Sequence, residues 1–283
     1  MNNSTETGYR LGFEKRTDSE IEYATNLTNK ITNSNFSNFE KLAGFPIFAP
    51  RQSVATFLYK HELFKKVLNV HGSIVECGVA YGAGLMSFAQ FSSIYEPVNY
   101  TRRIIGFDTF DGFPSVTHHD QIGDADHAHT GGMRVDSYNE LKDCIDLYDQ
   151  NRTLGHLPKV ELVKGDALKT IPKYVEDNPH LVVSLLYLDF DLYEPTLAAL
   201  KHFLPRMPKG AVLAFDELPT DTVRLSASTI KELFKSTNYN LQDVRKNKLV
   251  KPVSLSLLPQ EIKKIENVKK RKDLFIQIIL PLI

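Results

Sequence analysis

Cysteine is scarce in this chain of 283 residues, which contains only Cys77 and Cys144. Two thiols are too few for a disulfide framework or for a metal cage built from thiolates. Cys77 also lies within an apolar run, so we expect both cysteines to be reduced. Small disulfide-rich domains and thiolate metal sites are therefore excluded.

Net charge and long apolar runs are missing as well. The 34 Lys and Arg residues balance the 34 Asp and Glu residues, so no excess of positive charge is available to follow a phosphate backbone. The first twenty residues contain no apolar core of the kind that a signal peptide needs, and no run reaches the length of a membrane span. We therefore expect a cytoplasmic protein that binds neither nucleic acid nor membrane.

From about residue 74 onward, strand-like and helix-like segments alternate. This alternation is typical of an α/β protein with a doubly wound, mostly parallel sheet that is covered by helices on both faces. The expected strands lie at 73–80, 103–110, 160–168, 181–191 and 210–218. The terminal run LFIQIILPLI predicts one more buried strand, so we expect the C-terminus to be built into the sheet.

Two segments stand outside this alternation. Residues 1–70 are first rich in Asn, Ser and Thr and then weakly helical, so we expect an N-terminal helical cap segment before a main domain at 71–283. We expect the first twenty residues to be disordered. The cap segment could pack on a neighbouring subunit, which leaves both a monomer and a homo-oligomer open. Residues 114–136 have no periodicity, and long loops of this kind are usually lids or binding loops.

The first expected strand ends in VECGVAYGAG, which contains Glu76, Gly78, Gly82 and Gly84. Glycines allow a sharp turn and a close approach to a ligand, and the following helix N-terminus offers free amides. A dinucleotide fingerprint needs Gly-x-Gly-x-x-Gly, whereas the spacing here is Gly-x-x-x-Gly-x-Gly. An acid before the turn repels a pyrophosphate but suits an ammonium and a sulfonium, so the pattern favours S-adenosylmethionine over NAD. A turn that binds no ligand is the alternative.

Acids also end the next two expected strands. Asp108 ends the second strand, where one carboxylate can accept hydrogen bonds from both hydroxyls of a ribose. Asp166 ends the third strand, where it could accept a hydrogen bond from an adenine amino group. Open parallel sheets bind ligands at this edge, so the three acids together predict an adenosine site. The alternative for Asp108 is a turn or helix-capping acid.

The stretch LLYLDFDLYEPT carries Asp189 and Asp191 out of a buried strand, and FDEL places Asp216 and Glu217 at the end of the next strand. If the two strands are neighbours, their ends lie roughly 5 Å apart. Like charges at that distance cannot all stay ionised unaided. A divalent cation removes the difficulty, and oxygen ligands suit Mg²⁺, with Mn²⁺ as the alternative. Helix capping is the competing interpretation, above all for Asp191 and Glu194.

Other functions remain open at this point. His118, His119, His127 and His129 in the expected lid raise the hypothesis of a transition-metal site or a histidine general base. Clustered histidines in a flexible polar segment are more often solvated or in contact with substrate. An NAD(P)-dependent sugar oxidoreductase is a further alternative, against which the glycine spacing argues. A non-catalytic binding protein of the same fold is the last, against which the acids at every expected strand end argue.

Five stretches together resemble a known family: VECGVAYGAG, FDTFDGFP, KGDALKTIP, YLDFDLYEPTLAAL and PKGAVLAFDEL. Their order and spacing, over roughly residues 45–245, are similar to the macrocin O-methyltransferase (TylF/MycF-like) family of S-adenosylmethionine- and Mg²⁺-dependent sugar O-methyltransferases. The resemblance implies a Rossmann-like class I methyltransferase fold and a small-molecule acceptor, either a glycoside or a nucleotide-linked sugar.

The resemblance also implies roles for individual residues. Asp189 would be both a metal ligand and the general base, and Asp216 and Glu217 would be the other protein ligands. The family usually has two aspartates where this chain has Asp216 followed by Glu217. A longer side chain changes the reach, so the assignment of Glu217 is the less secure of the two.

Overall fold

The computed structural model describes residues 17–118, 120, 129–216 and 278–279. The chain divides into two compact units, Met1–Tyr59 and Lys60–Ile283. The division falls within helix α4 (Arg51–Val67), before the boundary that we expected at residue 70.

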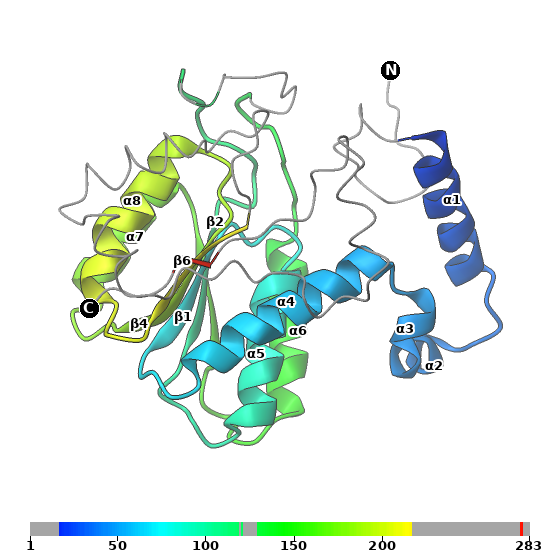
Figure 1. Cartoon of the computed structure of the whole chain (residues 1–283), viewed down its shortest axis with the longest axis horizontal. Helices are drawn as coiled ribbons and strands as arrows, with labels where there is room; N and C mark the ends of the chain where they lie inside the picture. Colours follow the sequence, from blue (N-terminus) through cyan, green and yellow to red (C-terminus); the bar gives the residue numbers. More distant parts are fainter. Residues whose placement is uncertain (1–16, 119, 121–128, 217–277, 280–283) are drawn as a thin grey trace. The chain divides into compact units, whose positions relative to one another are not determined.

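The first unit contains α1 (Asp18–Thr32), α2 (Asn38–Ala43), α3 (Phe45–Phe48) and the start of α4 (Figure 1). Helix α1 begins where the Glu20 carboxylate accepts hydrogen bonds from the backbone N–H and the hydroxyl of Thr17, both at 3.0 Å. Such capping satisfies donors that a helix N-terminus otherwise leaves free. The helix thus starts among the first twenty residues, which corrects the expected disorder at 18–20; residues 1–16 lie outside the described part.

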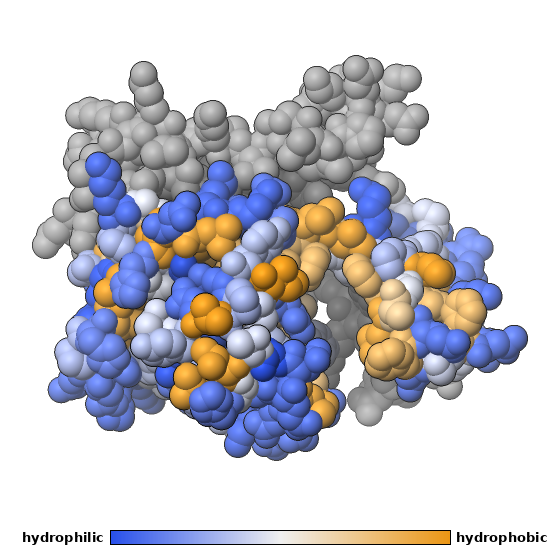
Figure 2. Space-filling model, turned by 90° about the horizontal axis from the view of Figure 1, so that it is seen from below, coloured by the Kyte–Doolittle hydropathy of each residue, from blue (hydrophilic) through white to orange (hydrophobic). Residues whose placement is uncertain are grey.

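Apolar side chains remain at the surface of this first unit (Figure 2). Phe39 is 82% exposed, Leu42 72% and Ile47 68%. Among residues 17–59, the buried apolar side chains are those of Ala24 and Phe48. Within its described residues, this unit therefore has little core of its own.

The second unit is built on a six-stranded sheet with the strand order β3-β2-β1-β4-β5-β6. Strands β1 to β5 are parallel, and β6 pairs antiparallel with β5. The α/β sheet and the C-terminal strand that we expected are confirmed. The bounds are β1 Ser73–Cys77, β2 Ile104–Asp108, β3 Val160–Lys164, β4 Val183–Leu188, β5 Val212–Phe215 and β6 Ile278–Ile279.

The observed strands are shorter than the expected ones at their carboxyl ends. Strand β1 ends at Cys77 because Gly78 has a φ of +92°, which turns the chain out of the extended conformation. Beyond β4, Asp191 has a φ of +56° and likewise leaves the sheet. Asp189 and Asp216 therefore lie in the turns just after β4 and β5, whereas Asp108 is the last residue of β2 and Glu76 lies inside β1.

Helices cover both faces of this sheet (Figure 1). Helices α5 and α6 lie on one face, and α7 and α8 lie on the other, as right-handed crossovers in this strand order require. The main core lies between the sheet and α7 and α8, where Ile105, Leu186 and Phe203 are fully or almost fully buried. The helix bounds are α5 Ala83–Tyr95, α6 Tyr138–Gln150, α7 Ala167–Asp177 and α8 Tyr193–Phe203, followed by the 3-10 helix η1 Leu204–Arg206.

The strand order reverses between β1 and β4. Helix α5, which follows β1, and helix α8, which follows β4, lie on opposite faces of the sheet. Ligands of doubly wound folds bind at the carboxyl ends of the strands at such a point. The chain that follows β1, β2, β4 and β5 therefore frames the candidate site. No helix within the described residues combines the length and the apolar character that crossing a membrane requires.

Candidate active site

The glycine-rich turn after β1 packs directly against the chain that leaves β4. A Cβ atom built on Gly78 would lie 2.0 Å from the backbone carbonyl oxygen of Asp189. At Gly82, which precedes α5 with a φ of +80°, a Cβ would lie 2.1 Å from the Leu141 side chain. These two glycines thus allow close contacts within the protein, because a side chain would not fit at either position. Gly78 lets the turn pack against the backbone of Asp189, the predicted general base.

Glu76 is buried and forms an ion pair with Lys60 of α4, with 3.1 Å between Oε1 and Nζ. A Cβ on Gly84 would lie 1.9 Å from that same oxygen, so Gly84 leaves room for the ion pair beside the first turn of α5. Burial raises the pKa of Glu76, and the charge of Lys60 opposes this effect. The second oxygen, Oε2, is buried and has no hydrogen-bond partner among the described residues.

Lys60 was not among the expected site residues. Helical spacing in the sequence could have indicated that Lys60 is buried. It lies on the same helix face as Leu63, Phe64 and Val67, which are fully buried. A lysine on the buried face of a helix needs a partner for its charge. The pattern could therefore have indicated an internal ion pair, although not its partner.

Asp108 holds the glycine-rich turn in place. Its Oδ2 accepts hydrogen bonds from the backbone N–H groups of Val79 (2.7 Å) and Ala80 (2.9 Å), and its Oδ1 accepts one from Phe110 (2.7 Å). Ala80 and Phe110 both have a positive φ, so strained backbone is concentrated at these strand ends. A carboxylate offers about four acceptor sites, so these three contacts leave room for about one of the two hydroxyl contacts that were predicted for a ribose.

Asp166 has the contacts of a helix cap. It precedes α7, and its Oδ1 accepts a hydrogen bond from the backbone N–H of Leu168 at 3.0 Å. Its Oδ2 lies 3.7 Å from the ammonium of Lys169. The adenine contact assigned to Asp166 stays a prediction.

Asp189 and Asp216 come together because β4 and β5 are neighbours, with Leu188 paired with Phe215 just before the two acids. The pKa of Asp189 is raised well above its usual value, first by burial and then by the negative charges of Asp216 and Asp191. The charge of Lys60 lowers this pKa in part. The structure therefore places mutually repelling carboxylates at this edge, as the sequence predicted.

Tyr187 is a second residue that the sequence interpretation missed. It is fully buried on β4, and its hydroxyl donates a hydrogen bond to Oδ1 of Asp216. The ammonium of Lys60 lies 3.7 Å from the centroid of its ring. A tyrosine inside an apolar run is typical of a core residue, and its spacing of two residues from Asp189 places both on the same side of the extended chain.

The described residues supply only part of the predicted metal site. Glu217 lies outside them, and within them no group of three or more His, Cys, Asp or Glu side chains could hold a metal ion. Asp189 and Asp216 nevertheless suit a divalent cation. Its positive charge would remove the repulsion between the two carboxylates.

The expected lid is anchored to the start of α8. Asp120 is buried, and its Oδ1 accepts a hydrogen bond from the backbone N–H of Tyr193 at 2.7 Å. Its Oδ2 accepts hydrogen bonds from the N–H and the hydroxyl of Thr117. His118 and His129 are exposed, whereas His119 and His127 lie outside the described residues. The lid function and the roles of these histidines stay predictions.

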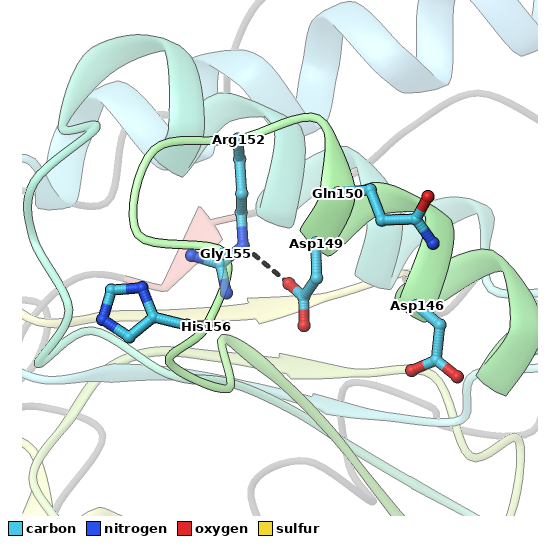
Figure 3. A pocket seen from close by; sticks show the side chains of 6 residues that line it. All are labelled: Asp146, Asp149, Gln150, Arg152, Gly155 and His156. Carbon is cyan, nitrogen blue, oxygen red and sulfur yellow. Dashed lines mark hydrogen bonds and ion pairs between the residues drawn. The ribbon is translucent and has the colours of Figure 1, made fainter.

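A surface pocket lies elsewhere, between the end of α6 and the start of β3 (Figure 3). Its position at the amino end of β3 is opposite to the edge that carries the acids. Arg152 donates a hydrogen bond to Asp149 at 2.6 Å and others to carbonyl groups of its own loop, so its charge is satisfied internally. We do not assign a catalytic role to this pocket. It is lined by Asp146, Asp149, Gln150, Arg152, Gly155 and His156.

Two curated relatives align with roughly half of the chain. The mycinamicin III 3''-O-methyltransferase of Micromonospora griseorubida is 26% identical over 152 residues, which are 52% of this chain and 56% of that protein. The 8-demethyl-8-(2,3-dimethoxy-alpha-L-rhamnosyl)-tetracenomycin-C 4'-O-methyltransferase of Streptomyces olivaceus is 26% identical over 159 residues, which are 55% of this chain and 56% of that protein. The chain thus spans little more than half the length of these relatives.

Solved structures extend the comparison. The calicheamicin methyltransferase CalS11 has a TM-score of 0.73 and 35% identity, covering 82% of this chain and 90% of that chain. The apo structure of CalS11, described as a TDP-rhamnose 3'-O-methyltransferase, has a TM-score of 0.61 and 36% identity, covering 74% and 83%. These likenesses confirm the class I methyltransferase fold. The sequence model of the TylF family, described as macrocin O-methyltransferase, matches residues 61–244, and because this match spans more than half of the chain, the chain belongs to that family.

Proposed function

We propose that the chain is an S-adenosylmethionine- and Mg²⁺-dependent O-methyltransferase that methylates a sugar hydroxyl, with Asp189 as the general base. The observation that carries the proposal is the contact between Gly78 and the backbone of Asp189. It places a carboxylate with a raised pKa beside the turn where the methyl donor would bind. Membership in the macrocin O-methyltransferase family supports the same reaction.

The residues around the turn fit the methyl donor. Bound S-adenosylmethionine would supply a methyl group that its sulfonium already activates. Glu76, whose Oε2 is buried with no hydrogen-bond partner among the described residues, would bind the positively charged part of the methyl donor. Gly78, Gly82 and Gly84 shape the turn, while Asp108 and Asp166 would hold the ribose and the adenine. The protein must mainly align the reacting atoms and exclude water.

Asp189, Asp216 and Glu217 would hold the divalent cation, Mg²⁺ or alternatively Mn²⁺. A sugar hydroxyl holds its proton at neutral pH, and a bound cation would lower the cost of negative charge on the acceptor oxygen. Asp189 takes the proton as the new bond forms, a role that typically contributes on the order of 10²–10⁴-fold in rate.

We propose as acceptor a glycoside or a nucleotide-linked sugar that presents neighbouring hydroxyls. The relatives are named for mycinamicin III, for a rhamnosyl tetracenomycin and for TDP-rhamnose. These names cover both acceptor types, so a test needs both. A cytoplasmic location, a lid at 114–136 and a helical cap segment at 1–70 belong to the same proposal.

The test is transfer of a labelled methyl group from S-adenosylmethionine to TDP-linked deoxysugars and to macrolide glycosides, with Mg²⁺ or with EDTA. Transfer that needs the divalent cation supports the proposal. Full transfer in EDTA contradicts the metal role, and Asp189 and Asp216 would then be turn or capping acids. Thermal shifts with S-adenosylhomocysteine and with NAD(P) separate a methyltransferase from an oxidoreductase, and binding without turnover would favour a non-catalytic protein.

A further inference from the structure

We propose that Lys60 and Tyr187 are positioning residues that connect the two halves of the predicted site, the cofactor side at Glu76 and the metal side at Asp216. This inference rests on the proposed function, because it concerns where a methyl donor and a divalent cation would bind. The contacts that carry it form a continuous path through the interior of the second unit.

Lys60 makes the first two contacts of this path. Its ammonium lies 3.1 Å from Oε1 of Glu76 and 3.7 Å from the centroid of the Tyr187 ring. All three residues are buried, with exposures of 6%, 2% and 0%. A buried ammonium needs compensation for its lost hydration, and here the carboxylate and the face of the aromatic ring supply it. Lys60 therefore fixes Glu76 and Tyr187 at once.

Tyr187 makes the last contact. Its hydroxyl donates a hydrogen bond to Oδ1 of Asp216, which restricts the rotation of a carboxylate that we assign to the metal. Phe88 of α5 packs against the Tyr187 ring at 5.9 Å between centroids and lies 5.7 Å from the ammonium of Lys60. Groups that orient a ligating carboxylate typically change metal affinity about 10–100-fold when they are removed.

A merely structural role makes a different prediction. If Lys60 and Tyr187 only stabilise the core, their substitution lowers the free energy of unfolding and leaves both ligand affinities unchanged. If they position the site, each substitution lowers the affinity for the ligand whose binding residue has lost its contact, which is Asp216 for the metal and Glu76 for the cofactor. Two separate measurements therefore decide, Mn²⁺ binding by electron paramagnetic resonance and S-adenosylhomocysteine binding by calorimetry.

The first variant is Tyr187→Phe, which removes one hydroxyl from a side chain of nearly the same shape. We expect Mn²⁺ affinity to fall about 10–100-fold and S-adenosylhomocysteine affinity to stay at the wild-type value. Tyr174→Phe is the matched control, because it also removes a hydroxyl-to-carboxylate hydrogen bond, to Glu161 at 2.9 Å, away from the acid cluster. We expect it to change neither affinity.

The second variant combines Lys60→Met with Glu76→Gln, so that no unpaired charge is left in the core. We expect Mn²⁺ affinity to fall, because the side chain that holds Tyr187 has lost its charge, whereas a fall in S-adenosylhomocysteine affinity follows already from the loss of the Glu76 carboxylate. The single variant Lys60→Arg, with Glu76 intact, keeps the cation and should retain part of both affinities. Lys159→Met is the matched control, because Lys159 is also buried but donates to the Asn99 carbonyl at 2.6 Å, beside the amino end of β3.

Failure of the inference is distinct from failure of the proposed function. If the wild type binds both ligands and Tyr187→Phe binds Mn²⁺ as tightly or more tightly, the positioning role is overturned while the proposed function stands. The same holds if the Lys60→Met, Glu76→Gln variant retains the Mn²⁺ affinity. If the wild type binds neither ligand, the proposed function and this inference fall together.

Discussion

Gly78 and Asp189 are in backbone contact: the position of a Cβ on Gly78 lies 2.0 Å from the carbonyl oxygen of Asp189. The backbone N–H of Asp189 also donates to the carbonyl of Cys77 at 2.7 Å. The turn after β1 and the turn after β4 are therefore in direct contact. Since these turns carry the predicted cofactor site and the predicted base, a change in one is expected to affect the other.

Gly78→Ala should be strongly destabilising, because the added methyl group meets backbone atoms that cannot rotate away. We expect a loss of at least about 3 kcal/mol from overpacking and left-handed strain combined. Gly131→Ala is the control, since Gly131 has a similar φ of +79° but nothing within 4 Å of its Cβ position. It should lose only about 1–2 kcal/mol. Equal losses in urea unfolding would contradict the contact.

Asp189→Asn and Asp216→Asn should differ in how they respond to metal. Asp216→Asn should weaken metal binding and recover part of its activity in excess Mg²⁺, because an amide oxygen can still ligate. Asp189→Asn should stay about 10²–10⁴-fold slower at saturating metal, because it removes the base. Initial rates over a Mg²⁺ titration measure both effects. Wild-type turnover by Asp189→Asn would remove this residue as the base.

Asp189→Asn should also stabilise the protein in the absence of metal. The pKa of Asp189 is raised on folding, so its ionisation opposes folding, and stability falls as the pH rises from the unfolded value, about 4, through the folded value. The variant should therefore melt higher than the wild type at neutral pH in EDTA. The difference should vanish near pH 4, where the wild-type carboxyl is protonated.

A surface substitution serves as the control for that measurement. Asp177→Asn removes an exposed ion pair with Lys173 and should shift the melting temperature little at either pH. If Asp189→Asn behaves like Asp177→Asn, the negative charge of Asp189 does not destabilise the folded protein. Addition of Mg²⁺ should raise the melting temperature of the wild type more than that of Asp189→Asn.

Asp108→Ala should weaken S-adenosylhomocysteine binding and also lower the stability. The substitution removes the acceptor of three backbone N–H groups, at Val79, Ala80 and Phe110. Each donor left unsatisfied costs roughly 1–3 kcal/mol where it stays buried. Calorimetry and urea unfolding measure the two effects. An unchanged affinity would show that the ribose assignment is wrong.

Much of this architecture could be predicted from the sequence because it depends on short-range patterns. Buried parallel strands read as apolar runs, and the acids that end them mark the edge of the sheet, so Asp108, Asp189 and Asp216 were found without a structure. Strand bounds were overestimated, because backbone turns at Gly78 and Asp191 are not encoded in hydrophobic periodicity.

Only the tertiary structure decided which side chains meet. Lys60 and Glu76 are separated by 16 residues, and Tyr187 and Asp216 by 29, and no periodic pattern specifies a pair across such a distance. The neighbouring positions of β4 and β5 bring the acids together. The packing of α4 places a cation beside them. The sequence by itself determined the strands and the acids at their ends, whereas the order of the strands and the packing of the helices decided the partners, because contacts between elements depend on how the whole chain folds.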